Sequence, residues 1–151
     1  MLLIKKIAIF GILFCLIASV AIFVFANEAN TTWQIITNIE KVLKENPLPV
    51  DKKSQLIKIA EDDTISAFVV RMMPGAELGP HYHESHDEIE YVIRGTAHLL
   101  VNDRWVEIKP GSIHFNPMGK VHAARNTGNE PLIVLIAFTP AMKETDRHFL
   151  K

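Results

Sequence analysis

Cysteine is almost absent from this sequence: its 151 residues contain only one, Cys15, inside an apolar N-terminal run. The rest of the chain therefore has neither disulfides nor thiolate ligands, even in an oxidising compartment. An excess of one charge is also absent, because 16 basic residues face 17 acidic ones. Generic binding to nucleic acid or to an anionic membrane surface is thereby disfavoured.

The first 26 residues have the pattern of an export signal. Lys5 and Lys6 precede residues 7–26, which carry no charge and end at Ala26. We expect residues 1–26 to be a signal peptide cleaved after Ala26, which would make the protein periplasmic or secreted. The alternative is an uncleaved membrane anchor formed by residues 7–26, because an apolar run of this length can also span a bilayer.

A short helix is expected between the export segment and the main domain. Apolar residues recur at three- and four-residue intervals from Trp33 to Leu43, and Pro47 prevents the helix from continuing. Residues 27–50 are therefore predicted to form a helix and a linker, and residues 51–151 a single domain. The apolar stripe of the helix is expected to cover an edge or end of that domain rather than bind a partner.

The main domain alternates between short apolar segments and turn residues. Glycine, proline, asparagine or aspartate interrupts the apolar segments at short intervals, a pattern typical of an all-β sandwich or barrel. Strands are predicted at residues 56–60, 65–73, 88–93, 96–101, 105–108, 113–116, 122–126 and 132–139.

Three histidines and one carboxylate are candidate metal ligands. His81 and His83 are two residues apart, so their side chains leave an extended chain on the same side. Glu88 begins the next predicted strand, and His122 opens a later one. Imidazole nitrogens and a carboxylate oxygen suit divalent transition metals. These side chains converge only if the sheet folds back on itself, as it does in a small barrel.

The spacing of these residues resembles the two sequence motifs of the cupin superfamily. The two motifs read Gly75-x5-His81-x-His83-x4-Glu88-x6-Gly95 and Gly111-x5-Pro117-x-Gly119-x2-His122-x3-Asn126. The resemblance implies a double-stranded β-helix, the cupin jelly-roll barrel, preceded here by the short helix. It also implies that His81, His83, Glu88 and His122 bind one divalent metal, and that the glycines and Pro117 form turns.

Glu90 is the candidate catalytic residue. Strand alternation places it on the same side as Glu88, toward the metal, where an unpaired carboxylate would be costly to bury. Three roles are open: a general acid or base acting on metal-bound substrate, a partner that orients a ligand histidine, or a salt bridge to Arg71, Arg94 or Arg125.

The other histidines are expected to be exposed rather than coordinating, with His114 near the rim of the pocket. They are His86, His98, His114 and His148. The pocket itself is expected to be small and mostly apolar. Its expected lining is Val92, Ala97, Leu99, Phe115, Ala124 and either Leu135 or Ile136.

The function predicted from these features is that of a single-domain metal-binding cupin acting on a small oxygenated molecule, as a dioxygenase, lyase or isomerase. Three nitrogens and one oxygen suit Mn²⁺, Fe²⁺, Ni²⁺ or Zn²⁺. Export disfavours an iron dioxygenase, because Fe²⁺ is harder to keep reduced outside the cytosol. The alternative is a non-catalytic module that binds a small ligand or the metal itself. A homodimer is an expectation from the family, and a membrane is a partner only if residues 7–26 remain attached.

Overall fold

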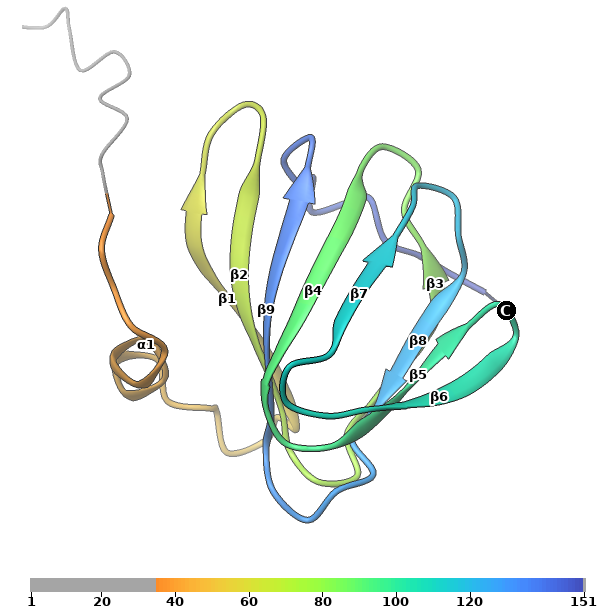
Figure 1. The fold of residues 1–151 in the computed structure, drawn as a ribbon. Coiled ribbons are helices and arrows are strands. Elements are labelled where there is room, and N and C mark those ends of the chain that lie inside the picture. The colour runs from red at the N-terminus through yellow and green to blue at the C-terminus, as the bar shows by residue number, and fades with distance from the viewer. Residues whose placement is uncertain (1–34, 151) are drawn as a thin grey trace, which may run out of the picture. The chain divides into compact units, whose positions relative to one another are not determined.

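Ten strands and one short helix make up residues 35–150, the part of the chain that this computed structural model describes (Figure 1). The expected export segment at residues 1–26 and the expected helix start near Trp33 lie outside the described residues. Within residues 35–150, no helix has both the length and the apolar character needed to cross a bilayer.

Eight of the ten strands were predicted, and their observed ends lie within two residues of the predicted ends. In chain order they are β1 (Ser54–Glu61), β2 (Ser66–Met72), β3 (Glu77–Tyr82), β4 (Asp87–Arg94), β5 (Ala97–Val101), β6 (Arg104–Ile108), β7 (Ile113–Asn116), β8 (His122–Arg125), β9 (Leu132–Thr139) and β10 (His148–Phe149). Strands β3 and β10 were not predicted. Strand β3 contains Gly79 and Pro80, which are both depleted in strands, and β10 is too short to show an alternating pattern.

Two antiparallel five-stranded sheets face each other (Figure 1). The first has the strand order β1-β2-β9-β4-β7 and the second the order β10-β3-β8-β5-β6. Strands that are far apart in the sequence are paired, since β9 lies between β2 and β4, and β8 lies between β3 and β5. This arrangement is the predicted double-stranded β-helix.

The space between the sheets holds the main apolar core. Phe68 and Met72 of β2 point into it, together with Val92, Ala97, Leu99, Leu132, Val134, Ile136 and Phe138. The prediction was wrong for Phe115, which is 58% exposed. Strand β7 pairs with β4 so that Asn116 lies opposite Glu88 and His114 opposite Glu90. These polar residues of β7 therefore take the inward positions, and Phe115 faces out.

The helix α1 (Ile39–Glu45) begins later than predicted. Asn38 is its N-cap, with a side-chain oxygen that accepts a hydrogen bond from the main-chain nitrogen of Lys41 at 2.8 Å. Such a cap satisfies one of the free N–H groups of the first turn and fixes the start of the helix. Ile36, which the apolar spacing placed inside the helix, is 98% exposed.

The apolar face of α1 covers the outer surface of the first sheet. Val42 and Leu43 are buried against Ile57 of β1, Val69 of β2 and Ile133 of β9. Burying such side chains contributes about 1.5–3 kcal/mol each relative to exposure. The expected covering role of the helix is therefore confirmed.

The turn between β4 and β5 requires glycine at position 95. Gly95 has a φ of +85°, in the left-handed region that side-chain-bearing residues rarely adopt. A Cβ atom there would also lie 2.8 Å from Cα of Leu132 and from the carbonyl oxygen of Pro131. Gly95 thus allows the chain to cross from the first sheet to the second directly beside the start of β9.

Candidate metal centre

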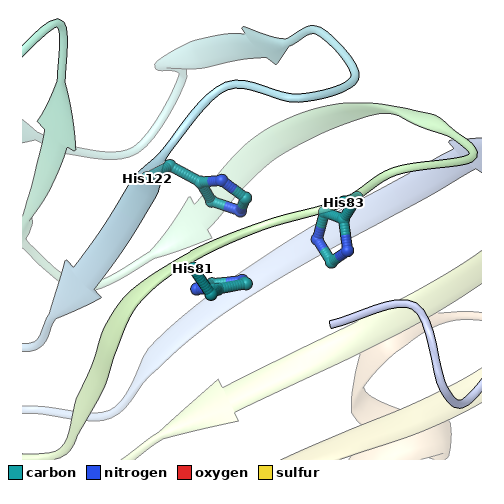
Figure 2. Close-up of side chains that lie close together, drawn as sticks. All are labelled: His81, His83 and His122. Atoms are coloured by element: carbon teal, nitrogen blue, oxygen red, sulfur yellow. The ribbon is translucent and has the colours of Figure 1, made fainter. Parts of the chain in front are cut away.

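The pairing of β3 with β8 brings the predicted histidines together. His81 lies opposite His122 in this pairing, and His83 follows directly after β3 (Figure 2). The ring centroids are 4.1 Å apart for His81 and His122, 5.2 Å for His81 and His83, and 5.3 Å for His83 and His122. One nitrogen from each ring lies within 4.8 Å of the other two, so a single ion could contact all three.

All three imidazoles are oriented in the same way, by a main-chain carbonyl. In each ring, Nδ1 lies at hydrogen-bond distance from a main-chain carbonyl oxygen, and Nδ1 of His122 also lies 2.8 Å from the side-chain amide nitrogen of Asn116. The carbonyls are those of Gly79 for His81 at 2.9 Å, Lys120 for His122 at 3.2 Å, and Asp146 for His83. A ring that donates Nδ1–H to its carbonyl carries its lone pair on Nε2, the atom that a metal would then bind.

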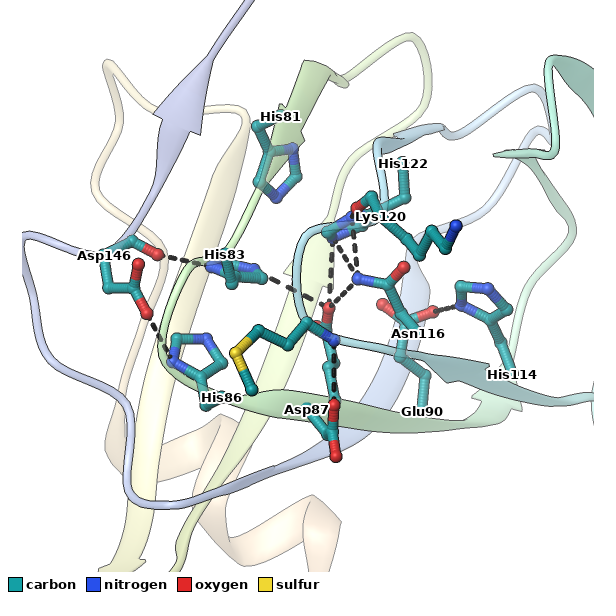
Figure 3. Close-up of polar contacts among 12 residues, drawn as sticks. His81, His83, His86, Asp87, Glu90, His114, Asn116, Lys120, His122 and Asp146 are labelled. Atoms are coloured by element: carbon teal, nitrogen blue, oxygen red, sulfur yellow. Dashed lines mark hydrogen bonds and ion pairs between the residues drawn. The ribbon is translucent and has the colours of Figure 1, made fainter.

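Glu88 joins the three histidines from β4 in the opposite sheet. Its Oε2 is 3.0 Å from Nε2 of His122 and 3.7 Å from Nε2 of His83, and the carboxylate is buried. The side-chain amide of Asn116 donates to the same oxygen at 3.4 Å (Figure 3). The structure therefore brings all four predicted ligands together, and the chemistry of this donor set suits a divalent transition metal.

The protonation of this cluster reflects its burial and its shared charges. Burial opposes a charge on Glu88, but the hydrogen bond and charge of His122 outweigh it and hold the pKa of Glu88 below its ordinary value. Burial likewise disfavours a charge on His122, but the hydrogen bond to Glu88 and the negative charge of Glu88 outweigh the effect of burial and raise the pKa of His122. Burial and the charge of His122 lower the pKa of His81 to about 4. A neutral His81 can offer Nε2 to a metal at neutral pH.

Glu90 has a histidine partner instead of an arginine. Its carboxylate oxygen Oε2 lies 3.2 Å from Nδ1 of His114, which is half-buried instead of exposed (Figure 3). Burial raises the pKa of Glu90, although the hydrogen bond to His114 opposes the shift. The salt bridge to an arginine is not formed. Arg71 donates to the carbonyl of Asn46, Arg94 pairs with Glu40, and Arg125 lies over the ring of Trp105.

His86 was expected to be exposed, and it is buried, at 1% exposure. The segment before Phe149 folds over the loop that carries His86, and Nδ1 of His86 lies 2.9 Å from Oδ2 of Asp146. The ring of His86 packs edge-on against Phe138, with centroids 4.8 Å apart. Burial lowers the pKa of His86. The sequence between His83 and Glu88 does not indicate that a distant segment covers His86.

Asp146 joins this covering segment to the loop at Glu84–His86, an arrangement that we call the Asp146 clamp. Oδ1 of Asp146 accepts from the main-chain nitrogen of Glu84 at 2.7 Å, and Oδ2 accepts from that of Ser85 at 2.9 Å. The hydroxyl of Ser85 also donates to Oδ2. Burial opposes the charge of Asp146, but these hydrogen bonds outweigh it and hold the pKa of Asp146 well below its usual range.

His83, His86 and Asp146 form a second group whose side-chain atoms are close enough to hold a metal. Most acceptor positions of the carboxylate are already occupied, however. His148 adds another contact, with Nε2 3.2 Å from Oδ1 of Asp146, and is therefore half-buried instead of exposed. A carboxylate that accepts several hydrogen bonds has little electron density left for an ion. The second group is better explained as a structural clamp.

A cavity of about 180 Å³ opens beside the histidine cluster. That volume corresponds to roughly six water molecules. Its polar wall is formed by His81, Glu88, Glu90, His122 and Arg147, and its apolar wall includes Met72, Leu99, Ile108, Leu132, Val134, Ile136 and Phe138. Arg147 and Asp146 were not predicted. Only the concentration of Asp146, Arg147 and His148 near the end of the sequence could have indicated them.

Comparisons with known proteins agree with this fold. The model of the cupin domain family matches residues 68–138. The chain is 34% identical over 111 residues to an uncharacterized protein of Aquifex aeolicus, and the match covers 74% of this chain and 88% of that protein. It is 36% identical over 63 residues to the oxalate-binding protein of Thermotoga maritima, covering 42% of this chain and about half, 52%, of that protein.

A solved structure has the same architecture. It is a protein with a double-stranded β-helix domain from Klebsiella pneumoniae, 25% identical to this chain, with a TM-score of 0.63. The match covers 72% of this chain and 91% of that structure. The likeness therefore extends over most of the two sheets.

Proposed function

The chain belongs to the cupin superfamily, and on that premise we propose that it is an enzyme that acts on a small oxygenated molecule through one divalent transition metal. His81, His83, Glu88 and His122 would hold the ion. The observation that carries the proposal is the convergence of the three imidazoles, since one nitrogen of each ring lies within 4.8 Å of the other two and each Nδ1 contacts a main-chain carbonyl.

The donor set fits Mn²⁺, Fe²⁺, Ni²⁺ or Zn²⁺, and thiolate-preferring ions are disfavoured because the proposed ligands include no sulfur. When bound, the metal would polarise an oxygen atom of the substrate as a Lewis acid. The apolar side of the cavity would keep bulk water away from this oxygen, which strengthens electrostatic interactions at the site.

Glu90 would exchange a proton with the substrate. It lines the same cavity as His81 and His122, and burial raises the pKa of its carboxyl. A carboxyl whose pKa is raised holds its proton more readily and can serve as a proton donor as well as an acceptor. His114 contacts one oxygen of Glu90 and would hold the other toward the cavity. Such proton movement suits a lyase or isomerase.

A non-catalytic binding protein is the second candidate. The similarity to a protein named as oxalate-binding favours it, over the half of that protein that the match covers. The same metal and cavity would then capture a small ligand without turnover.

The proposal also includes export. The charge-free run at residues 7–26 after Lys5 and Lys6 supports a signal peptide of residues 1–26 or, alternatively, an uncleaved anchor. Mass spectrometry of the N-terminus of the protein from its native host would distinguish cleavage after Ala26 from retention. A homodimer remains a prediction, and sedimentation velocity of the purified domain tests it.

The central test is metal analysis of protein purified from its native compartment, followed by reconstitution with each of the four ions. About one ion per chain is expected, and no ion in either preparation would reject the proposal. A screen of small acids, enols and diols, with oxygen uptake recorded, then tests turnover.

Once the screen has found turnover, the Glu90→Gln variant tests the role of Glu90 in proton transfer. Loss of the proton carrier should lower turnover at least about 100-fold while the metal is retained. Glu107→Gln, at an exposed position of β6, is the matched control and should keep full activity. Turnover that is unchanged in Glu90→Gln would exclude Glu90 as the acid or base.

A further inference from the structure

We propose that Arg147 recognises the substrate of the metal site and that this substrate is a small carboxylate. The inference rests on the proposed function, because the same molecule would contact Arg147 and the metal.

Arg147 belongs to the segment that covers the histidine cluster. It lies between Asp146 of the clamp and β10, whose residue Phe149 pairs with His81 of β3. Its side chain lines the cavity together with His81 and His122. The guanidinium is therefore part of the wall of the metal pocket.

The guanidinium of Arg147 has no partner among residues 35–150. Its Nε is buried without a hydrogen bond, and the described residues form no ion pair with it. Arg71 and Arg125 also have a buried Nε without a hydrogen bond, but Arg71 donates through Nη2 to Asn46 and Arg125 lies over Trp105. Arg147 alone of these three faces the cavity. A partly buried cation without an anion costs free energy that a bound anion would recover.

The charge balance of the pocket also favours an anion. A divalent ion with Glu88 as its only anionic ligand retains one positive charge, and Arg147 adds a second. Glu90 also lines the cavity and, when ionised, adds one negative charge, which leaves at least one positive charge in the pocket. A neutral sugar or diol would leave that charge uncompensated.

The apolar wall of the cavity favours a small carboxylate among small anions, because a carboxylate brings a carbon chain with its charge. A carboxylate can bind a metal through one oxygen and receive two parallel hydrogen bonds from a guanidinium, which is planar and forked. The volume of about 180 Å³ limits the ligand to a few non-hydrogen atoms. The apolar wall formed by Leu99, Val134 and Ile136 would accept the carbon chain of an acid.

The test uses the domain loaded with Zn²⁺, freed of excess zinc and titrated calorimetrically at constant ionic strength. Malonate and acetate are the carboxylate probes, and malonamide is the neutral counterpart of malonate. The parent should bind malonate more strongly than malonamide. Arg147→Gln should weaken malonate binding about 10- to 100-fold and leave zinc affinity unchanged within a few-fold. Lys143→Gln, an exposed change in the same segment, is the control and should bind malonate like the parent.

Arg147→Lys keeps the positive charge and the apolar stem of the side chain. It therefore tests carboxylate recognition if the Arg147→Gln variant does not fold. It should bind malonate more weakly than the parent, because lysine lacks the fork. Equal malonate affinity in the parent and the Arg147 variants would overturn the proposal, as would equal binding of malonate and malonamide. Zinc binding without any carboxylate binding would overturn this inference alone. Failure of the parent to bind a metal would instead reject the proposed function.

Discussion

Two groups of buried polar side chains share His83 but differ in how their donor atoms are used. In the metal centre, Nδ1 of His81, His83 and His122 lies near main-chain carbonyls, and Nε2 of His83 and of His122 faces the carboxylate of Glu88. In the Asp146 clamp, the carboxylate of Asp146 accepts hydrogen bonds from the main chain and from a serine hydroxyl. Residue types alone indicate a metal site in both places. In the second group the carboxylate of Asp146 is already occupied by donors, although both ring nitrogens of His86 are buried without a hydrogen bond.

The two groups are nevertheless connected. His83 donates Nδ1–H to the carbonyl of Asp146, so the clamp orients one of the proposed ligands (Figure 3). Partners of this kind, one step removed from a metal, usually change its affinity by about 10- to 100-fold. The clamp should therefore affect the metal indirectly, through the position of His83 and through stability.

The most direct test of the difference between the two groups is to replace one buried histidine from each. His81→Ala removes a proposed ligand, and we expect the affinity for Zn²⁺ to fall by more than the 100-fold typical of indirect partners. His86→Ala removes a ring that lies beside Asp146, and the affinity should fall by less than about tenfold. Calorimetric titration of the metal-free variants measures both values.

The control for these variants is His98→Ala. His98 is a half-buried histidine on β5, and its Nδ1 lies 2.9 Å from the hydroxyl oxygen of Thr127, outside both groups. Its replacement should leave the zinc affinity unchanged. If His86→Ala instead lost as much affinity as His81→Ala, the second group would be a metal site and the comparison would be wrong.

Replacing the clamp carboxylate should have a smaller effect on the metal and a clear effect on stability. Asp146→Asn keeps the size of the side chain but removes the charge that the hydrogen-bond donors of Glu84 and Ser85 contact. We expect the free energy of unfolding to fall by about 2–3 kcal/mol and zinc affinity to fall about tenfold. Urea unfolding and zinc titration measure the two effects.

Asp63→Asn provides the matched control, because Asp63 is exposed and lies outside the clamp. Its stability should stay within about 0.5 kcal/mol of the parent. An Asp146→Asn variant as stable as this control would show that the clamp contributes little to the fold.

The sequence predicted the four proposed ligands because their positions follow local rules. Alternation in an extended chain puts His81 and His83 on one side, and motif spacing identified Glu88 and His122. The same local rules failed for Phe115 and His86. The register between β4 and β7 turns Phe115 outward. The loop that holds His86 is covered by a distant segment, since Glu84 contacts Asp146, 62 residues later in the sequence.

Arg147 and Asp146 could not be predicted for the same reason. Both lie on a segment whose only regular structure is the two-residue strand β10, so no period in the sequence indicates which way their side chains point. Their positions depend on pairing between β10 and β3. Contacts between segments far apart in the sequence thus assemble the histidine cluster and determine the details of the pocket, whereas local pattern indicates the strands and the candidate ligands.

The smallest expected effect is the acid sensitivity of the clamp. The hydrogen bonds to Asp146 outweigh its burial and lower its native pKa below the ordinary value of 3.8. A carboxylate with a lowered native pKa stabilises the fold fully above the ordinary pKa, and the contribution is lost as the pH falls toward the native pKa. In metal-free protein, the stability difference between the parent and Asp146→Asn should be constant from about pH 7 to 5 and should shrink below about pH 4. Urea unfolding at each pH measures it, and a difference that does not change with pH would mean that the charge of Asp146 is not what holds the clamp.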